Sequence, residues 1–128
     1  MQDKEKIIIN YHIQDDPLSE ENLDKTLNYL HEFRLLMPQK TIWLYSGFTW
    51  TELFKYDEKI EEYPHYLRKD VMEIYRKRQE IIKNVDVLID GRYIDSQRDI
   101  SLKWCGSSNQ RVIDVKKSLK QNKVVLYE

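Results

Sequence analysis

Hydrophobic positions along the chain follow two patterns that alternate from the N-terminus onward. Short apolar runs rich in β-branched and aromatic residues predict strands at Ile7–Ile13, Thr41–Tyr45 and Val85–Ile89. Between these runs, apolar residues recur at spacings of three and four and predict helices over residues 19–36 and 66–82. The order strand, helix, strand, helix, strand predicts an α/β fold with a parallel sheet built from βαβ units.

The remaining segments are less regular. Residues 50–54 are predicted to form a short helix, and residues 92–105 a loop or a short helix. Residues 112–115 begin either a strand or a helix, and residues 124–127 are predicted to be a final strand. A chain of 128 residues matches one domain, so residues 1–128 are interpreted as a single domain.

Small and polar residues follow the predicted strands at the points where these strands end. Parallel strands direct their carboxyl ends to one edge of a sheet, and ligands bind at that edge in open α/β folds. Glycine lets a backbone approach a ligand closely, and hydroxyl and amide groups supply hydrogen bonds. The candidate ligand-binding residues at this edge are Ser46, Gly47, Asp90, Gly91, Ser107, Ser108 and Asn109, to which the family resemblance described below adds Asp16.

Each candidate also has a simpler structural interpretation. Gly47 and Gly91 suit tight turns, and Asp16 suits a turn followed by a helix cap. Asn109 is the most informative of the set, because its amide can donate and accept hydrogen bonds at once. Cys105 is interpreted as a small, partly buried apolar residue rather than a reactive thiol.

Composition narrows the function classes. The net charge of −1 gives no argument for nucleic acid or a membrane surface as a partner, and no apolar run is long enough to span a bilayer. A single cysteine excludes an internal disulfide framework and fits a reducing cytoplasm. The three histidines share no metal-ligand spacing, so no catalytic residue and no metal site is assigned.

Four motifs together carry a family resemblance: Asp16-Pro17-Leu18 and the segments 41–48, 85–93 and 102–115. In order and spacing, from about Ile7 to the C-terminus, they resemble the activating proteins of anaerobic ribonucleoside-triphosphate reductase. These proteins are small radical S-adenosylmethionine (SAM) enzymes of the glycyl-radical activase group. The resemblance implies a partial barrel of parallel strands, of which this chain is the C-terminal part, a half-barrel of the radical-SAM type.

The resemblance also implies a chemistry, from which the chain departs. In the family, three cysteines on one loop hold a [4Fe–4S] cluster, and cleavage of SAM generates a glycyl radical on the reductase. This chain offers only Cys105, and one thiolate cannot hold a cluster within a monomer. The family's Gly-Gly-Asp-Pro motif is replaced by Gln14-Asp15-Asp16-Pro17, which adds side chains where backbone meets SAM.

Two functional hypotheses follow from the resemblance. The first is a truncated or diverged activating protein, catalytically incomplete alone. Its partners would be the anaerobic reductase and either a second copy of itself, as a homodimer, or a separate cluster-bearing fragment. The alternative is a non-enzymatic protein-binding or regulatory module derived from the same fold, whose exposed first strand must be covered by a partner.

Overall fold

The computed structural model describes residues 6–10, 16–54 and 60–128. Within this part of the chain, one sheet has the strand order β1-β2-β3-β4. Its strands are β1 (Lys6–Ile9), β2 (Thr41–Tyr45), β3 (Val87–Asp90) and β4 (Arg111–Asp114). β1, β2 and β3 are parallel, as predicted, while β4 is antiparallel to β3.

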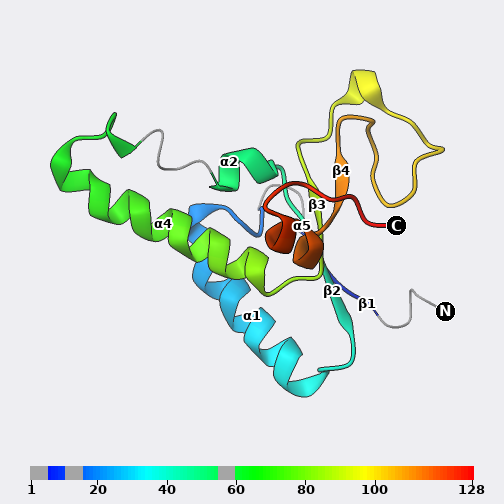
Figure 1. The fold of residues 1–128 in the computed structure, drawn as a ribbon, viewed down its shortest axis with the longest axis horizontal. Helices are drawn as coiled ribbons and strands as arrows, with labels where there is room; N and C mark the ends of the chain where they lie inside the picture. The colour runs from blue at the N-terminus through cyan, green and yellow to red at the C-terminus, as the bar shows by residue number, and fades with distance from the viewer. Residues whose placement is uncertain (1–5, 11–15, 55–59) are drawn as a thin grey trace.

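The direction of β4 corrects the expectation of an all-parallel sheet. The connection from Gly91 to Gln110 contains only a short 3-10 helix, η3 (Asp95–Gln97). A parallel return needs a crossover that packs over the sheet, usually a helix. Here the chain turns back at the same edge instead, so Asp90 lies opposite Arg111. We call residues 92–110 the lobe; Figure 1 shows it projecting beyond the ends of β3 and β4.

The helices over residues 23–36, 50–54 and 65–83 correspond to predicted ones, although the first begins four residues later than predicted; no helix range was predicted for residues 115–121. The helices are α1 (Leu23–Leu36), α2 (Trp50–Phe54), α4 (His65–Lys83) and α5 (Val115–Gln121), with the short η2 (Glu20–Asn22) before α1. Figure 1 shows α1 and α4 next to each other, and both pack against the sheet. The segment 124–127 lies beside β4 through a single bridge between Ile113 and Leu126. Of the predicted first strand, residues 11–13 lie outside the described residues.

The two faces of the sheet are covered differently. On the helix side, Leu44 and Leu88 pack with Leu30 of α1 and Ile81 of α4 in a fully buried core. Alternate strand residues point to the opposite face, as the pleat requires.

On that opposite face, Trp43, Val87 and Ile89 form a second, smaller buried cluster. The rings of Trp104 and Tyr127 cover Trp43 edge-on, with centroids 5.1 and 5.0 Å away. Trp104 and the C-terminal segment therefore cover this face of the sheet, whereas helices cover the other face.

Candidate functional site

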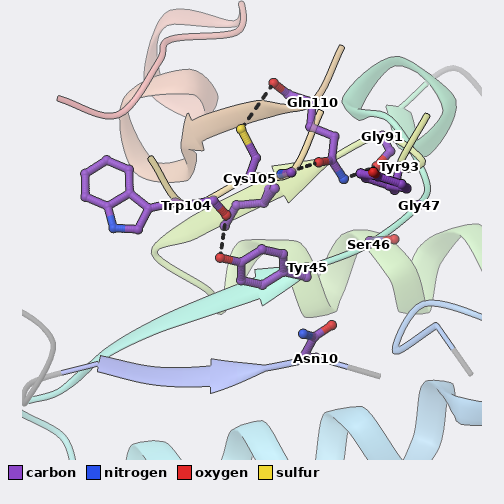
Figure 2. Close-up of a pocket in the computed structure, with 11 residues that line it drawn as sticks. Asn10, Tyr45, Ser46, Gly47, Gly91, Tyr93, Trp104, Cys105 and Gln110 are labelled. Carbon is purple, nitrogen blue, oxygen red and sulfur yellow. Dashed lines mark hydrogen bonds between the residues drawn. The ribbon is translucent and has the colours of Figure 1, made fainter. Parts of the chain in front are cut away.

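A cavity of about 340 Å³ lies at the carboxyl ends of β2 and β3 (Figure 2). The lobe forms much of its wall. The lining residues are Asn10, Tyr45, Ser46, Gly47, Ile89, Gly91, Tyr93, Trp104, Cys105, Gly106 and Gln110. None of these side chains carries a formal charge at neutral pH, whereas three of them are aromatic. Such walls offer ring faces and hydrogen-bonding groups rather than ionic partners.

Gln110 joins the lobe to the end of β3. Its Oε1 accepts hydrogen bonds from the backbone N–H groups of Gly106 (2.9 Å) and Ser107 (3.1 Å). Its Nε2 donates to the carbonyl of Gly91 at 3.1 Å. The side chain thus uses both ends of its amide to fix two walls of the cavity relative to each other, as Figure 2 shows in part.

Two glycines permit this geometry. Gly91 has φ 97°, in the region that favours glycine. At Gly106, an added Cβ would lie 3.2 Å from the ring of Tyr93, so this ring lies close against the backbone. A side chain at either position would strain or displace the cavity wall.

Trp104 holds a strained backbone conformation in the same wall. Its φ is 71°, which is uncommon for a bulky residue. The hydroxyl of Tyr45 donates to its carbonyl at 2.6 Å, a bond drawn in Figure 2. Edge-to-face contacts with Trp43 and Tyr127 further fix the indole ring.

Two ionisable groups of the wall are kept neutral. Burial, with a smaller contribution from nearby Cys105, raises the pKa of Tyr45 above its usual value. Burial, together with the negative charge of Asp99, raises the pKa of the Cys105 thiol. The thiolate is the nucleophilic form, so this environment disfavours a reactive cysteine.

Asp16 lies beside the cavity, with its carboxylate directed at the end of β2. It accepts hydrogen bonds from the Gly47 backbone N–H (2.6 Å), the Ser46 hydroxyl (2.9 and 3.1 Å) and the Leu18 backbone N–H (2.9 Å). Both oxygens are therefore engaged within the chain. The carboxylate ties the turn before α1 to the loop after β2.

Asp90 is only 1% exposed and lies behind the cavity rather than in its lining. Its carboxylate forms a two-point ion pair with Arg111, at 2.7 and 3.2 Å. It also accepts the backbone N–H of Trp50, at the start of α2, at 2.8 Å. Asp90 thus links β3, β4 and α2, and its charge is compensated on all sides.

The serines and the asparagine of the lobe bond mainly to one another and to nearby backbone. The buried Ser107 hydroxyl donates to Asn109 Oδ1 at 2.6 Å and accepts the backbone N–H of Ile94 at 3.2 Å. Asn109 Nδ2 donates to the carbonyl of Arg92 at 2.7 Å. Ser108 is exposed, and its hydroxyl lies 3.2 Å from Gln97 Oε1.

The structure brings all eight candidate residues to the same end of the sheet but gives them different places. Ser46, Gly47 and Gly91 line the cavity. Asp16, Asp90, Ser107, Ser108 and Asn109 are instead engaged in hydrogen bonds outside the lining.

Sequence reasoning missed several lining residues, above all Tyr45, Tyr93 and Gln110. Tyr45 and Gln110 lie in motifs that carry the family resemblance, and membership of these motifs was the sequence signal that could have indicated them. Tyr93 also lies in such a motif, but nothing in its local pattern indicates that its ring would turn onto Gly106.

The residues present do not suit an iron–sulfur cluster. Among the residues with described positions, no group of three or more His, Cys, Asp or Glu side chains is arranged to hold a metal ion. The 128-residue sequence contains one cysteine, whereas a [4Fe–4S] cluster is held by several thiolates. In the same described ranges, no helix has the length and apolar character needed to cross a bilayer.

Comparison with known proteins defines the family. The profile described as "4Fe-4S single cluster domain" matches residues 15–113. The chain belongs to this family.

Several curated relatives share one name. The anaerobic ribonucleoside-triphosphate reductase-activating protein of Vibrio cholerae is 32% identical over 95 residues, 74% of this chain and 48% of its own. The proteins of that name from Haemophilus influenzae (32% over 95 residues, the same shares) and Escherichia coli (29% over 97 residues, 76% of this chain and 49% of that protein) are similar.

These matches confirm the resemblance seen in the four motifs. The chain spans about half the length of the curated relatives it matches. No solved structure matches it.

Proposed function

We propose that this chain acts in the activation of an anaerobic ribonucleotide reductase and contributes the ligand-binding edge of an activating protein. The observation that carries the proposal is the cavity at the carboxyl ends of β2 and β3. Relatives named as activating proteins of this reductase match across three quarters of the chain.

In this proposal the sheet is the C-terminal part of a radical-SAM-type partial barrel. Three consecutive parallel strands with helices on one face support this interpretation. The cavity opens at the strand ends, where barrels of parallel strands place their ligands. β4, antiparallel to β3, would close the sheet on the lobe side.

SAM is the proposed ligand of the cavity. The rings of Tyr45 and Tyr93 suit the adenosyl part of such a molecule. The cavity walls hold no carboxylate for its positive charge, and Asp16 is already engaged. Gln14 and Asp15, which replace the family's glycines, lie outside the described residues.

The cluster ligands come, in this proposal, from outside these 128 residues, through a second polypeptide or another part of the protein. Cys105 alone does not suffice, and its raised pKa disfavours the thiolate that a cluster requires. The chain by itself is then catalytically incomplete. A cluster held elsewhere would supply the electron for cleavage of SAM.

The alternative function is a non-enzymatic module that binds the reductase and regulates it. The single cysteine and the engaged carboxylate of Asp16 favour this alternative. It predicts binding of the reductase without binding of SAM.

Equilibrium dialysis with labelled SAM, with the chain alone and mixed with the reductase, tests both functions. We expect SAM to bind in the mixture, with affinity reduced about tenfold or more by Tyr93→Ala because a wall of the cavity is removed. Leu35→Ala, a change of an exposed residue on α1, is the matched control and should have no effect. Reductase binding is measured in parallel by biolayer interferometry: reductase binding without SAM binding would favour the regulatory module, and absence of both would contradict either function.

A further inference from the structure

Arg78 of α4 contacts two segments that meet beside the cavity. Its Nε donates a hydrogen bond to the carbonyl of Leu18 at 2.8 Å, in the turn that follows Asp16. Its guanidinium carbon lies over the ring of Phe48, in the loop after β2, at 4.4 Å from the ring centroid. The side chain is partly buried. One guanidinium group therefore joins a helix, a turn and a loop that are far apart in the sequence.

Phe48 is bonded through its backbone to two residues of the cavity lining. Its N–H donates to the Ser46 hydroxyl at 3.1 Å, and its carbonyl accepts the N–H of Gly91 at 3.3 Å. Ser46 and Gly91 both line the cavity. The ring that Arg78 covers therefore belongs to a residue that connects the end of β2 to the end of β3.

The turn at Leu18 is connected to the same wall of the cavity. The carboxylate of Asp16 accepts the N–H of Leu18 at 2.9 Å and the N–H of Gly47, a lining residue, at 2.6 Å. On the α1 side, the hydroxyl of Thr26 donates to the carbonyl of Pro17 at 2.8 Å. The two helices, which lie next to each other in Figure 1, thus each hold one carbonyl of this turn.

From these contacts we propose that Arg78 is a positioning residue for the ligand of the cavity. Arg78 is not among the described residues that line the cavity, so it acts through Leu18 and Phe48. The inference rests on the proposed function, because the ligand in question is SAM. Walls that already have the bound arrangement lose less conformational entropy on binding, and affinity falls with the fraction of molecules that have it.

The chemistry of arginine fits this position. A planar guanidinium can donate a directional hydrogen bond from its edge while its face lies on an aromatic ring. Lysine supplies a charged donor without the planar face, and methionine supplies an unbranched stem without donor or charge. Substitution of Arg78 by Met and by Lys therefore separates the contribution of the whole group from that of its charge.

Equilibrium dialysis of labelled SAM with the complete 128-residue chain and the reductase tests the role. Arg78→Met should weaken SAM binding about tenfold, as expected if about one tenth of the molecules keep the required arrangement. Arg78→Lys should give a smaller loss, because the charged donor remains. Arg76→Met is the matched control, since it removes the same group from an exposed position of α4, where Arg76 pairs with Glu73. This variant should bind SAM like the unmodified chain.

Two further measurements separate positioning from general stability. Ile82→Val truncates a fully buried residue of α4, so it should lower the melting temperature but leave the affinity for SAM unchanged. Amide hydrogen exchange of the chain alone needs no ligand. In Arg78→Met, the amides of Phe48 and Gly91 should exchange faster, whereas that of Leu88 inside β3 should not change.

Each contrary result has a distinct meaning. SAM binding by Arg78→Met at the affinity of the unmodified chain would overturn the positioning role and leave the proposed function intact. Equal losses of affinity in Arg78→Met and Ile82→Val would overturn it too, because general destabilisation would then explain both. Unchanged exchange at Phe48 and Gly91 would show that Arg78 does not hold the loop, with the same consequence. Absence of SAM binding by the unmodified chain would overturn the proposed ligand and the positioning role together.

Discussion

The helix-covered core and the lobe are held together by different interactions. In the core, side chains such as Leu30, Ile81 and Leu88 are fully buried against one another. In the lobe, Gln110, Asn109 and other polar side chains bond to backbone groups, and most residues are exposed. The core therefore determines whether the chain folds, whereas the lobe determines the shape of the cavity.

Leu88→Ala tests the core side of this comparison and should have the largest effect. Leu88 lies in β3, and its side chain is fully buried in the core formed with the helices. Truncation should lower the free energy of unfolding by about 3 kcal/mol, through lost burial and the cavity left behind. Urea unfolding followed by circular dichroism measures it, with Leu35→Ala as an exposed control. A loss below about 1 kcal/mol would show that the core is loosely packed.

Asp90→Asn tests the junction between core and lobe. The neutral amide loses the two-point pair with Arg111, although it can still accept from the backbone of Trp50. Arg111 is partly exposed and can be rehydrated, so the cost should be about 2 kcal/mol rather than the larger penalty of a fully buried pair. The same unfolding experiment measures it, and an unchanged midpoint would mean that the pair contributes nothing to the junction.

Asn109→Ala tests the lobe itself. Its amide bonds to Arg92 and to the buried Ser107, so removal should cost about 1 kcal/mol. The loosening should be local. Amide hydrogen exchange should become faster at Ile94, whose N–H depends on Ser107, and stay unchanged in β3. Faster exchange throughout the sheet would show that the lobe and the core unfold as one unit.

The pH dependence of Cys105 should give the smallest effect. Burial raises the pKa of this thiol above its ordinary value of 9.0, so the folded state holds the proton more tightly than the unfolded state. The resulting contribution to stability is complete below pH 9 and is lost as the pH rises through the higher folded pKa. At pH 8, iodoacetamide should alkylate Cys105 more slowly in the folded chain than in urea. Equal rates would contradict a protected thiol.

The contrast between the helix-covered core and the lobe also explains which parts of the structure could be predicted from the sequence. β2 and α4 follow from local apolar periodicity, and their observed bounds lie within one residue of the predicted ranges. The direction of β4 did not follow, because a short apolar run predicts a strand but not the strand's orientation.

The cavity wall was only partly predictable. Of the candidates named from small and polar residues at the strand ends, Ser46, Gly47 and Gly91 line the cavity, and their binding of a ligand stays a prediction. Tyr93 and Trp104 enter the wall through bonds between distant segments, such as the one from Tyr45 to the carbonyl of Trp104. No local pattern encodes such contacts.

The central claim is that this chain supplies a binding edge but not the cluster that its family is named for. Anaerobic reconstitution of the purified chain with iron and sulfide, followed by iron analysis and visible absorption of the monomer fraction, tests it most directly. We predict no stoichiometric iron and no broad iron–sulfur absorption, because one thiolate is available per chain. About four iron atoms per monomer with a [4Fe–4S] spectrum would contradict it.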